Sequence, residues 1–215
     1  DDVKRMLELG CEIGNHSWDH ANMYELSLDS VVKEFNDADQ ALIDACGQAS
    51  TVVRAPYGNA NEDIMNAVGK PFFMWSLDSL DWKYKDVDLD YKSIMQDNSS
   101  VIKDGTIILM HDIHEPSVKA AERIIPELIN MGFKLVTVSE MAEAKNVTLQ
   151  NASYNNFWQD ILDEGLVPGY AGNSTSDADT SDSTEDSSDG SEDGSSSDGS
   201  EDYSDGSEDG SNSSE

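Results

Sequence analysis

The sequence predicts an α/β fold with parallel strands over residues 1–145. In some stretches apolar residues recur at the spacing of a helix, and in others they form short continuous runs. The two kinds of stretch alternate along the chain, which is typical of a parallel sheet whose strands are linked by helices. In such folds the residues that carry chemistry lie at the carboxyl ends of the strands.

Glycines, acids and a proline set the boundaries of the predicted elements. Gly10 and Gly47 end the first two helices, Asp29 lies in the first turn of the second, and Pro126 should kink the fifth. The predicted helices cover residues 3–9, 28–45, 62–68, 90–101, 117–131 and 139–144. The predicted strands cover residues 11–15, 51–54, 72–76, 106–110 and 134–136.

The chain after residue 145 has two parts of different composition. Residues 146–172 contain apolar side chains that could form a terminal helix packed on the first domain, namely Phe157, Trp158, Ile161, Leu162 and Leu166. Residues 173–215 are dominated by Ser, Asp, Glu and Gly, and DGSEDGS occurs at 189–195 and again at 205–211. Because this composition cannot bury a core, we expect a disordered acidic tail.

The charge of the chain argues against a nucleic-acid partner. The net charge is -31, and residues 1–172 remain acidic without the tail, so nothing would neutralise phosphates. Cys11 and Cys46 are too few for a disulfide framework; they could form one disulfide or remain free buried thiols. No apolar run reaches the length of a membrane span, and no signal peptide is visible.

The four histidines occur in two pairs, each just after a predicted strand. His16 and His20 lie in NHSWDH, and a spacing of four places both imidazoles on one side of a helical turn, where they can bind one metal ion. The alternative is a pair of surface histidines. His111 and His114 lie in IILMHDIH, where His111 could be a general acid and Leu109 could wall a small apolar pocket. The alternative is a core histidine with satisfied hydrogen bonds.

Two further motifs lie at strand ends. In RAPYG, Arg54 can orient a carboxylate, and the turn can aim a backbone N–H at a developing oxyanion. Alternatively, this motif only ends a strand. In WSLDSLDW, Asp81 could pair with a histidine and raise its pKa, which would keep it protonated as an acid. Alternatively, Asp78 and Asp81 only cap the turn that follows.

Taken in order, these motifs resemble those of a known family. H-S-x-x-H, R-x-P-Y, D-x-x-D-W and L-x-H closely resemble motifs two to five of the polysaccharide deacetylase family, also called the NodB homology domain or carbohydrate esterase family 4. The resemblance covers roughly residues 10–144. WSLDSLDWKYKD and LMHDIH are most similar to bacterial peptidoglycan N-acetylglucosamine deacetylases.

The resemblance implies a fold and a metal site. The fold would be a distorted, incomplete (β/α) barrel of parallel strands. A divalent metal, usually Zn²⁺, would be held by two histidines and an aspartate, and by motif match the histidines are His16 and His20. The metal would polarise the amide carbonyl and lower the pKa of its bound water, and a carboxylate would take the proton of that water.

The resemblance also implies roles for the other motif residues. His111 would protonate the leaving amine, and Asp81 would tune it. Arg54 would orient the catalytic base. Two further roles concern the substrate. The Tyr57 N–H would help to hold the oxyanion. The pocket for the acetyl methyl would be lined by Trp82 and Leu109.

The sequence departs from the family at the first motif. T-F-D-D-G, which would supply the base and the third metal ligand, is absent. Asp1 and Asp2 do not replace it, because they precede an amphipathic stretch and resemble helix N-terminal acids. We therefore expect a chain that is cut at its N-terminus, lacks at least one barrel strand and has an open sheet edge. Such a piece should be inactive, whereas the parent protein should be an enzyme.

The implied activity is metal-dependent hydrolysis of N-acetyl groups on a cell-wall polysaccharide, peptidoglycan first, by an extracellular or cell-surface protein. Chitin oligomers and acetylated xylan are alternative substrates, because the motifs are shared. An alternative of another class is a non-catalytic, surface-displayed glycan-binding protein, which the missing base and the acidic tail would fit. A T-F-D-D-G upstream of Asp1 would favour the enzyme.

Overall fold

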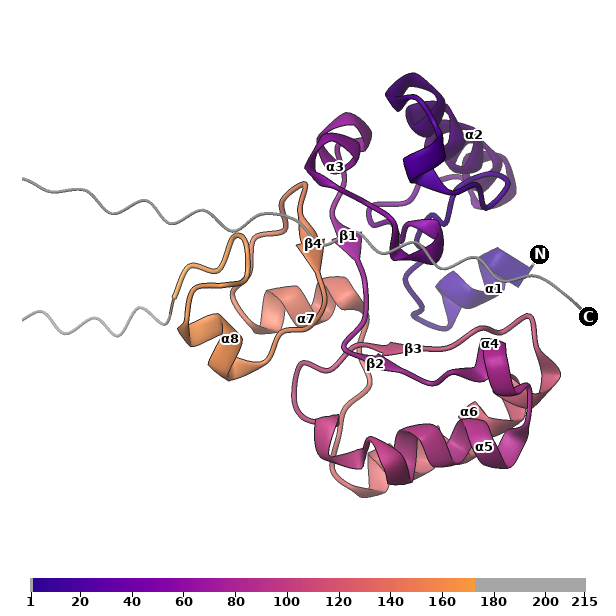
Figure 1. The fold of residues 1–215 in the computed structure, drawn as a ribbon, viewed down its shortest axis with the longest axis vertical. Helices are drawn as coiled ribbons and strands as arrows, with labels where there is room; N and C mark the ends of the chain where they lie inside the picture. The colour runs from indigo at the N-terminus through magenta and orange to yellow at the C-terminus, as the bar shows by residue number, and fades with distance from the viewer. Residues whose placement is uncertain (1, 173–215) are drawn as a thin grey trace, which may run out of the picture. The chain divides into compact units, whose positions relative to one another are not determined.

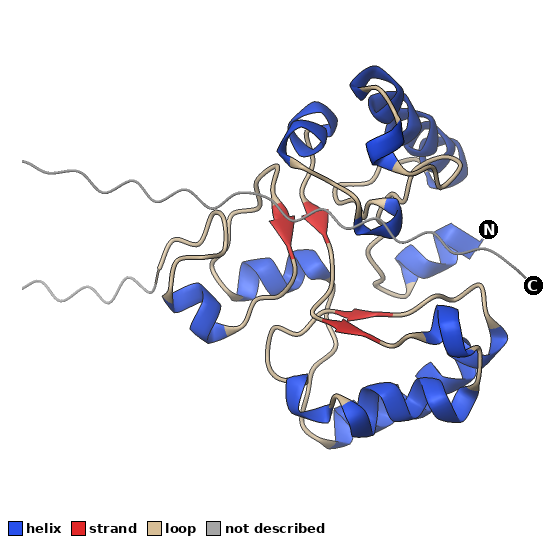
Figure 2. Ribbon diagram, viewed as in Figure 1, coloured by secondary structure: helices blue, strands red, loops and turns tan. Residues whose placement is uncertain are grey.

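The computed structural model describes residues 2–172 (Figure 1). The acidic tail predicted over residues 173–215 lies outside the described residues, as does Asp1. The described part has helices linked to parallel strands, as the sequence predicts (Figure 2). None of its helices combines the length and the apolar character that crossing a membrane requires.

The helices lie close to their predicted positions, with one exception. The predicted helix over 90–101 is replaced by a shorter α-helix, a π-helical turn at Ser93–Asp97 and a 3₁₀ turn at Ser99–Val101. The α-helices are α1 (Asp2–Glu8), α2 (Leu28–Cys46), α3 (Glu62–Val68), α4 (Asp81–Tyr84), α5 (Val87–Lys92), α6 (Glu115–Asn130), α7 (Val138–Ala144) and α8 (Gln159–Asp163). Two further 3₁₀ turns cover Met23–Glu25 and Pro56–Gly58.

The ends of α2 show why the helix predictions succeed. The Ser27 side chain accepts a hydrogen bond from the Ser30 N–H at the start of α2, which satisfies a backbone donor that the helix leaves free. Gly47 ends the helix at φ 89°, a left-handed conformation that glycine adopts without strain. Both signals are local in sequence, so a single chain reveals them.

The strands are short and form two parallel pairs. β1 (Phe72–Phe73) pairs with β4 (Ser153–Tyr154), and β2 (Leu77–Asp78) pairs with β3 (Ile108–Leu109) (Figure 2). Single parallel bridges extend the first pair, because Asn15 joins Val53 and Val53 joins Phe72. No closed barrel forms among the described residues.

The predicted strand over 134–136 is wrong. This segment has no strand partner among the described residues, and Lys134 and Leu135 are exposed. A strand needs a neighbour to satisfy its N–H and C=O groups, so an apolar sequence alone does not make one. The strands predicted at 11–15 and 51–54 shrink to single bridges in the same way.

Residues after 145 pack on the strands that precede them. β4 runs beside β1, and the Tyr154 ring stacks on Phe73 and on Phe157 with centroids 5.3 and 5.7 Å apart. Gly105 meets this group closely, because a Cβ built on it would lie 2.3 Å from the Phe157 carbonyl oxygen. The segment thus contributes to a buried apolar cluster that also contains Leu162 of α8.

Two other apolar clusters lie under the strand ends. One joins α2 to β1 through Val31, Phe35 and Phe72. The other packs α6 beside α5 and under β2 (Figure 1). Its residues Ala120, Ile124 and Leu128 recur at every fourth position of α6. Away from these clusters, Cys11 and Cys46 are both free, and Cys11 is exposed rather than buried.

Candidate functional site

The site residues predicted from the sequence follow four neighbouring strand segments. His16 follows the Asn15 bridge, Arg54 follows Val53, Asp81 lies after β2, and His111 lies after β3. The structure places His16 beside Arg54, with the His16 Nδ1 2.8 Å from the Arg54 carbonyl oxygen, and Asp81 beside His111, with 2.7 Å between Oδ1 and Nδ1. In each pair the two residues lie at the carboxyl ends of parallel segments, as expected for an α/β fold.

The His16 imidazole is oriented by a backbone carbonyl. Its Nδ1 lies 2.8 Å from the Arg54 carbonyl oxygen, and because a carbonyl only accepts, Nδ1 must carry the proton. The lone pair is then on Nε2, the arrangement that metal-binding histidines use. Burial lowers the pKa of His16 more than this hydrogen bond raises it, and the charges of His20, Arg54 and His111 lower it further. The neutral, ligating form is favoured.

His20 lies beside His16, but not through a helical turn. The two ring centroids are 4.9 Å apart at 76°. The helical spacing expected from the sequence is wrong, because Ser17 and His20 have φ values of 69° and 64°. Residues other than glycine rarely adopt this left-handed conformation, and when they do they concentrate at functional sites.

Arg54 is anchored by backbone oxygens rather than by a carboxylate. Its Nε donates to the Phe73 carbonyl at 2.9 Å and one terminal nitrogen donates to the Met74 carbonyl at 3.2 Å. The guanidinium also lies over the Trp75 ring, 5.9 Å from its centroid. Burial lowers the pKa of Arg54, but a guanidinium stays charged in proteins. A fixed positive charge therefore lies beside the histidines.

Tyr57 forms the rim of the site next to His20. Its backbone is left-handed at φ 59°, and its exposed ring lies edge-on to the His20 ring at 4.8 Å. Gly58 follows at φ 71°, and a Cβ there would lie 3.1 Å from the Trp75 ring. The RAPYG turn thus places the Tyr57 ring against the His20 ring and brings Gly58 close to the Trp75 ring.

Asp81 pairs with His111 through two hydrogen bonds. The Asp81 Oδ1 lies 2.7 Å from the His111 Nδ1, and the His111 N–H donates to Oδ2 at 2.6 Å. Asp81 is fully buried. Burial alone would raise the pKa of Asp81, but the two hydrogen bonds from His111 lower it overall, which favours the ionised carboxylate.

The remaining predicted residues surround this pair. Trp82 is half exposed, and its N–H donates to the Asp81 Oδ1 at 2.8 Å. Leu109 is buried two residues before His111. Asp78 accepts from the Leu80 N–H at 2.8 Å, so for this residue the capping alternative holds. His114 occupies the N-cap position of α6 without a side-chain capping bond.

His16 and His20 are the candidate ligands for a metal ion among the described residues. Their ring centroids lie 4.9 Å apart, and the proton on Nδ1 of His16 leaves the lone pair of its Nε2 for a metal. Residues 2–172 contain no group of three His, Cys, Asp or Glu side chains that could hold a metal. The site therefore fits a metal through its two imidazoles only.

Sequence reasoning missed one buried carboxylate near the site. Asp90 is fully buried, and within the described residues neither of its oxygens has a hydrogen-bond partner. It occupies a position of α5 between apolar residues, Val87 on one side and Ile94 on the other. An acid inside an apolar helical stripe is the signal that could have found it.

The chain matches known proteins along much of the described part. The family that matches is described as Polysaccharide deacetylase, over residues 1–71. A peptidoglycan-N-acetylglucosamine deacetylase, PgdA, of Listeria monocytogenes is 34% identical over 139 residues, 65% of this chain and 29% of its own length. A peptidoglycan-N-acetylmuramic acid deacetylase, PdaC, of Bacillus subtilis is 38% identical over 141 residues, 66% of this chain and 29% of its own length. The chain thus spans under a third of the length of these relatives.

Solved structures match the fold. A structure described as T48 deacetylase with substrate has 32% sequence identity and a TM-score of 0.65, over 71% of this chain and 74% of that one. A family 4 acetyl xylan esterase from Clostridium thermocellum, in complex with a cobalt ion, has 28% identity and a TM-score of 0.65, over 72% of this chain and 77% of that one.

Proposed function

The chain belongs to the polysaccharide deacetylase family, and from this premise we propose that it is the catalytic part of an enzyme that hydrolyses N-acetyl groups on a cell-wall polysaccharide. The observation that carries the proposal is the hydrogen-bonded pair of His111 and the buried Asp81, together with the adjacent imidazoles of His16 and His20. We further propose that the protein acts outside the cell or at its surface, where such a wall substrate lies.

We assign His16 and His20 as ligands of a divalent metal, Zn²⁺ in the first instance. The metal, when bound, polarises the carbonyl and acidifies a water molecule. The protein's own part is to present neutral imidazoles. The Arg54 carbonyl does this for His16 by holding the proton on Nδ1.

His111 is assigned as the general acid that protonates the leaving amine. Its Nδ1 is engaged with Asp81, so the proton for the amine is carried on Nε2. The ionised Asp81 compensates the charge of the imidazolium and fixes the direction of the ring. In this proposal His111 donates the proton, and the buried Asp81 carboxylate orients its ring.

The other residues are assigned to the substrate and the base. Arg54 would orient a carboxylate base by its fixed charge. The left-handed backbone of Tyr57 would direct its N–H to the oxyanion. Trp82, half exposed, and Leu109, buried, would line the pocket for the acetyl methyl. We also infer that the two strand pairs are parts of one incomplete (β/α) barrel, with residues 146–172 packed against it.

Residues 1–215 alone should be inactive. Within the described part no carboxylate joins the two imidazoles, so neither a base nor a third metal ligand is at hand there. General-base catalysis contributes about 10²- to 10⁴-fold in rate. A polypeptide that also supplies T-F-D-D-G should regain this factor. Sequencing the gene upstream of the Asp1 codon shows whether the natural protein carries that motif.

The test is acetate release with Zn²⁺ on four substrates. They are peptidoglycan acetylated on glucosamine only, peptidoglycan acetylated on muramic acid only, a chitin oligomer and acetylated xylan. We expect the glucosamine substrate to be preferred, and His111→Ala to remove the activity on it. Equal rates with and without the His111→Ala substitution, in a polypeptide that also supplies T-F-D-D-G, would refute the assigned acid. Preference for one of the other three substrates would assign that one in place of the glucosamine substrate.

A non-catalytic glycan-binding protein is the second candidate. The absence of a base among the described residues favours it. This candidate predicts that the natural protein binds peptidoglycan in a pull-down yet releases no acetate from it. Measurable turnover that depends on His111 would exclude it.

A further inference from the structure

Four consecutive backbone N–H groups in the histidine loop donate to side chains. The Ser17 N–H donates to Asn15 Oδ1 at 2.9 Å, and the His20 N–H donates to Ser17 Oγ at 3.0 Å. Between them, the N–H groups of Trp18 and Asp19 both donate to Glu34 of α2, at 3.1 and 3.0 Å. The loop lacks the pairing of a helix or sheet, so these side chains hold its backbone.

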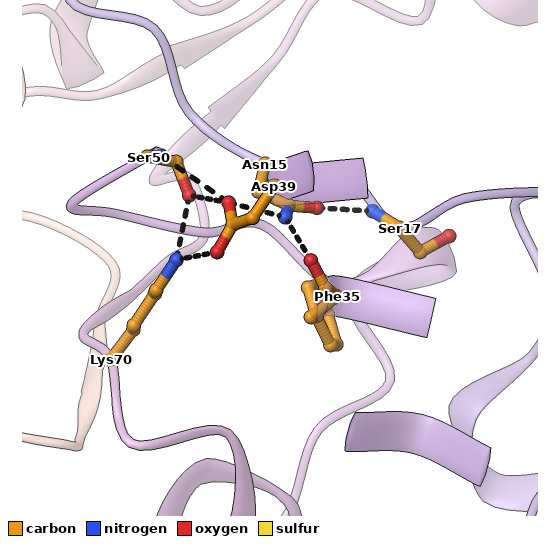
Figure 3. A network of polar contacts seen from close by, with 6 residues as sticks. All are labelled: Asn15, Ser17, Phe35, Asp39, Ser50 and Lys70. Atoms are coloured by element: carbon orange, nitrogen blue, oxygen red, sulfur yellow. Dashed lines mark hydrogen bonds and ion pairs between the residues drawn. The ribbon is translucent and has the colours of Figure 1, made fainter. Parts of the chain in front are cut away.

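Asn15 is the buried centre of this arrangement (Figure 3). Its Nδ2 donates to the Phe35 carbonyl and to Asp39 Oδ1, both at 2.8 Å, while its Oδ1 receives the Ser17 N–H. The amide is therefore fixed by α2 at one end and by the loop at the other. A rotation of this amide would withdraw the acceptor that holds Ser17 in its left-handed conformation.

Asp39 is held in turn from outside α2. Lys70, which precedes β1, forms an ion pair with Asp39 and donates to Ser50 Oγ at 3.0 Å, and Ser50 Oγ donates to Asp39 Oδ1 at 2.7 Å (Figure 3). The side chains of Lys70 and Asp39 are only 21% and 13% exposed. Removal of one partner would leave a largely buried charge, and the remaining groups would rearrange to reach water.

We propose that the Asp39–Lys70 ion pair is a positioning device for the two candidate metal ligands, acting through Asn15 and Ser17 on the His16–His20 loop. The proposal rests on the proposed function only in so far as these histidines bind a metal. Neither Asp39 nor Lys70 touches a histidine by a hydrogen bond, so both act at a distance on the backbone that carries the rings.

The chain offers a matched control on the same helix. Lys33 and Asp37 form a second ion pair of α2, but their side chains are 74% and 38% exposed, and the hydrogen bonds of the Asn15 amide within residues 2–172 go to other groups. Asp39→Asn and Asp37→Asn are the same chemical change two residues apart. A loss that follows helix charge or general stability should appear in both variants, whereas loss of positioning should appear in Asp39→Asn alone.

Two measurements on the full chain test the proposal. The first is Zn²⁺ affinity by calorimetry, which we expect to fall by about 10- to 100-fold in Asp39→Asn, as for other residues that orient metal ligands. The second is amide hydrogen exchange without metal. We expect the Ser17 and His20 amides to exchange faster relative to Ala120 in α6, and Asp37→Asn to match the unsubstituted chain in both measurements.

Unchanged Zn²⁺ affinity and unchanged loop exchange in a folded Asp39→Asn would overturn the proposal. If this variant does not fold, Lys70→Met replaces it and Lys70→Arg should restore both readouts; failure of the Arg variant to restore them would equally overturn it. If the unsubstituted chain binds no Zn²⁺, the proposed metal role fails, and the exchange measurement still decides whether Asp39 and Lys70 position the loop.

Discussion

The two hydrogen bonds between Asp81 and His111 lead to a prediction for catalysis. Asp81→Asn places an amide where the carboxylate accepts, so the imidazole loses its orienting charge. In an active polypeptide that contains this chain, we expect kcat to fall by about 10²- to 10⁴-fold with little change in KM. Steady-state acetate release measures both.

Asp78→Asn is the control for that substitution. It lies in the same motif, and an amide oxygen can still accept the Leu80 N–H that Asp78 accepts. It should leave kcat within a few-fold of the unsubstituted enzyme. Equal losses in the two variants would mean that the loop, and not the Asp81–His111 pair, sets the rate.

Asp90 leads to a prediction for stability. Burial raises the pKa of Asp90, and the neighbouring charge of Asp81 raises it further. Protonation is then favoured in the folded state, so the folded state is penalised once pH rises through the ordinary pKa near 4 and up to the raised value. Asp90→Asn should raise the free energy of unfolding by about 1–3 kcal/mol at pH 7.

The pH dependence identifies the cause. The gain from Asp90→Asn should shrink as pH falls through the raised pKa and should vanish below about pH 4, where the acid is protonated in both states. Urea denaturation across pH 3–8 measures it, with the exposed Asp63→Asn as control. A gain that stays constant with pH would mean that charge is not the reason.

At this scale the sequence predicts the residues of local motifs and misses their partners. His16, His20 and His111 lie at strand ends in patterns that a single chain displays. Asn15 meets Asp39 across 24 residues, and no local pattern marks such a pair. Helical spacing misjudged the His16–His20 backbone because side chains from α2, which the spacing does not include, stabilise a left-handed loop there.

Gly105 leads to a prediction at the scale of elements. It has φ 91°, and a Cβ would lie 2.3 Å from the Phe157 carbonyl oxygen. Gly132 has a similar φ of 94°, but nothing lies within 4 Å of its Cβ position. Both Ala variants should lose about 1–2 kcal/mol from the backbone conformation. Gly105→Ala should lose about 1–3 kcal/mol more, because the segment after β4 must move.

Thermal denaturation of the two variants measures the difference. Because the backbone strain is common to both positions, the difference between the two variants reports how closely residues 157–158 approach the chain that precedes β3. Similar melting temperatures for Gly105→Ala and Gly132→Ala would show that the segment after β4 yields without cost.

Helices were predicted better than strands for a physical reason. A helix bonds within itself, so caps such as Ser27 and Gly47 and the spacing of apolar residues decide its limits. A strand exists only where a neighbour accepts its bonds, and that neighbour is remote in sequence. β1 therefore ends after two residues although the apolar run continues.

The acidity of the whole molecule predicts its response to salt. With a net charge of -31, repulsion among carboxylates opposes the compact state. Raising NaCl from about 0.01 to 0.3 M shortens the screening length severalfold, so we expect the melting temperature at pH 7 to rise. The rise should be smaller at pH 4.5, where carboxylates begin to be protonated. A fall with salt would show that ion pairs such as Lys70–Asp39 outweigh the repulsion.

The fold class of the whole molecule was predictable from the sequence, but the extent and closure of its sheet were not. Alternating periodicity predicts parallel strands linked by helices, and the motif order predicts the family to which the chain belongs. How far the strands extend and whether they close depends on pairings between distant segments. The pairing of β4 with β1 is one of these, and no sequence pattern in residues 146–172 predicts it.

The pairing of β1 with β4 has a consequence for folding during translation on the ribosome. β1 is translated long before β4, so its edge and the Phe73 ring must wait, uncovered, for Tyr154 and Phe157 to emerge. Contacts between such remote segments form slowly, and an uncovered edge invites association with other nascent chains. The side of β1 that pairs with β4 is therefore covered only after the segment that carries β4 has left the ribosome.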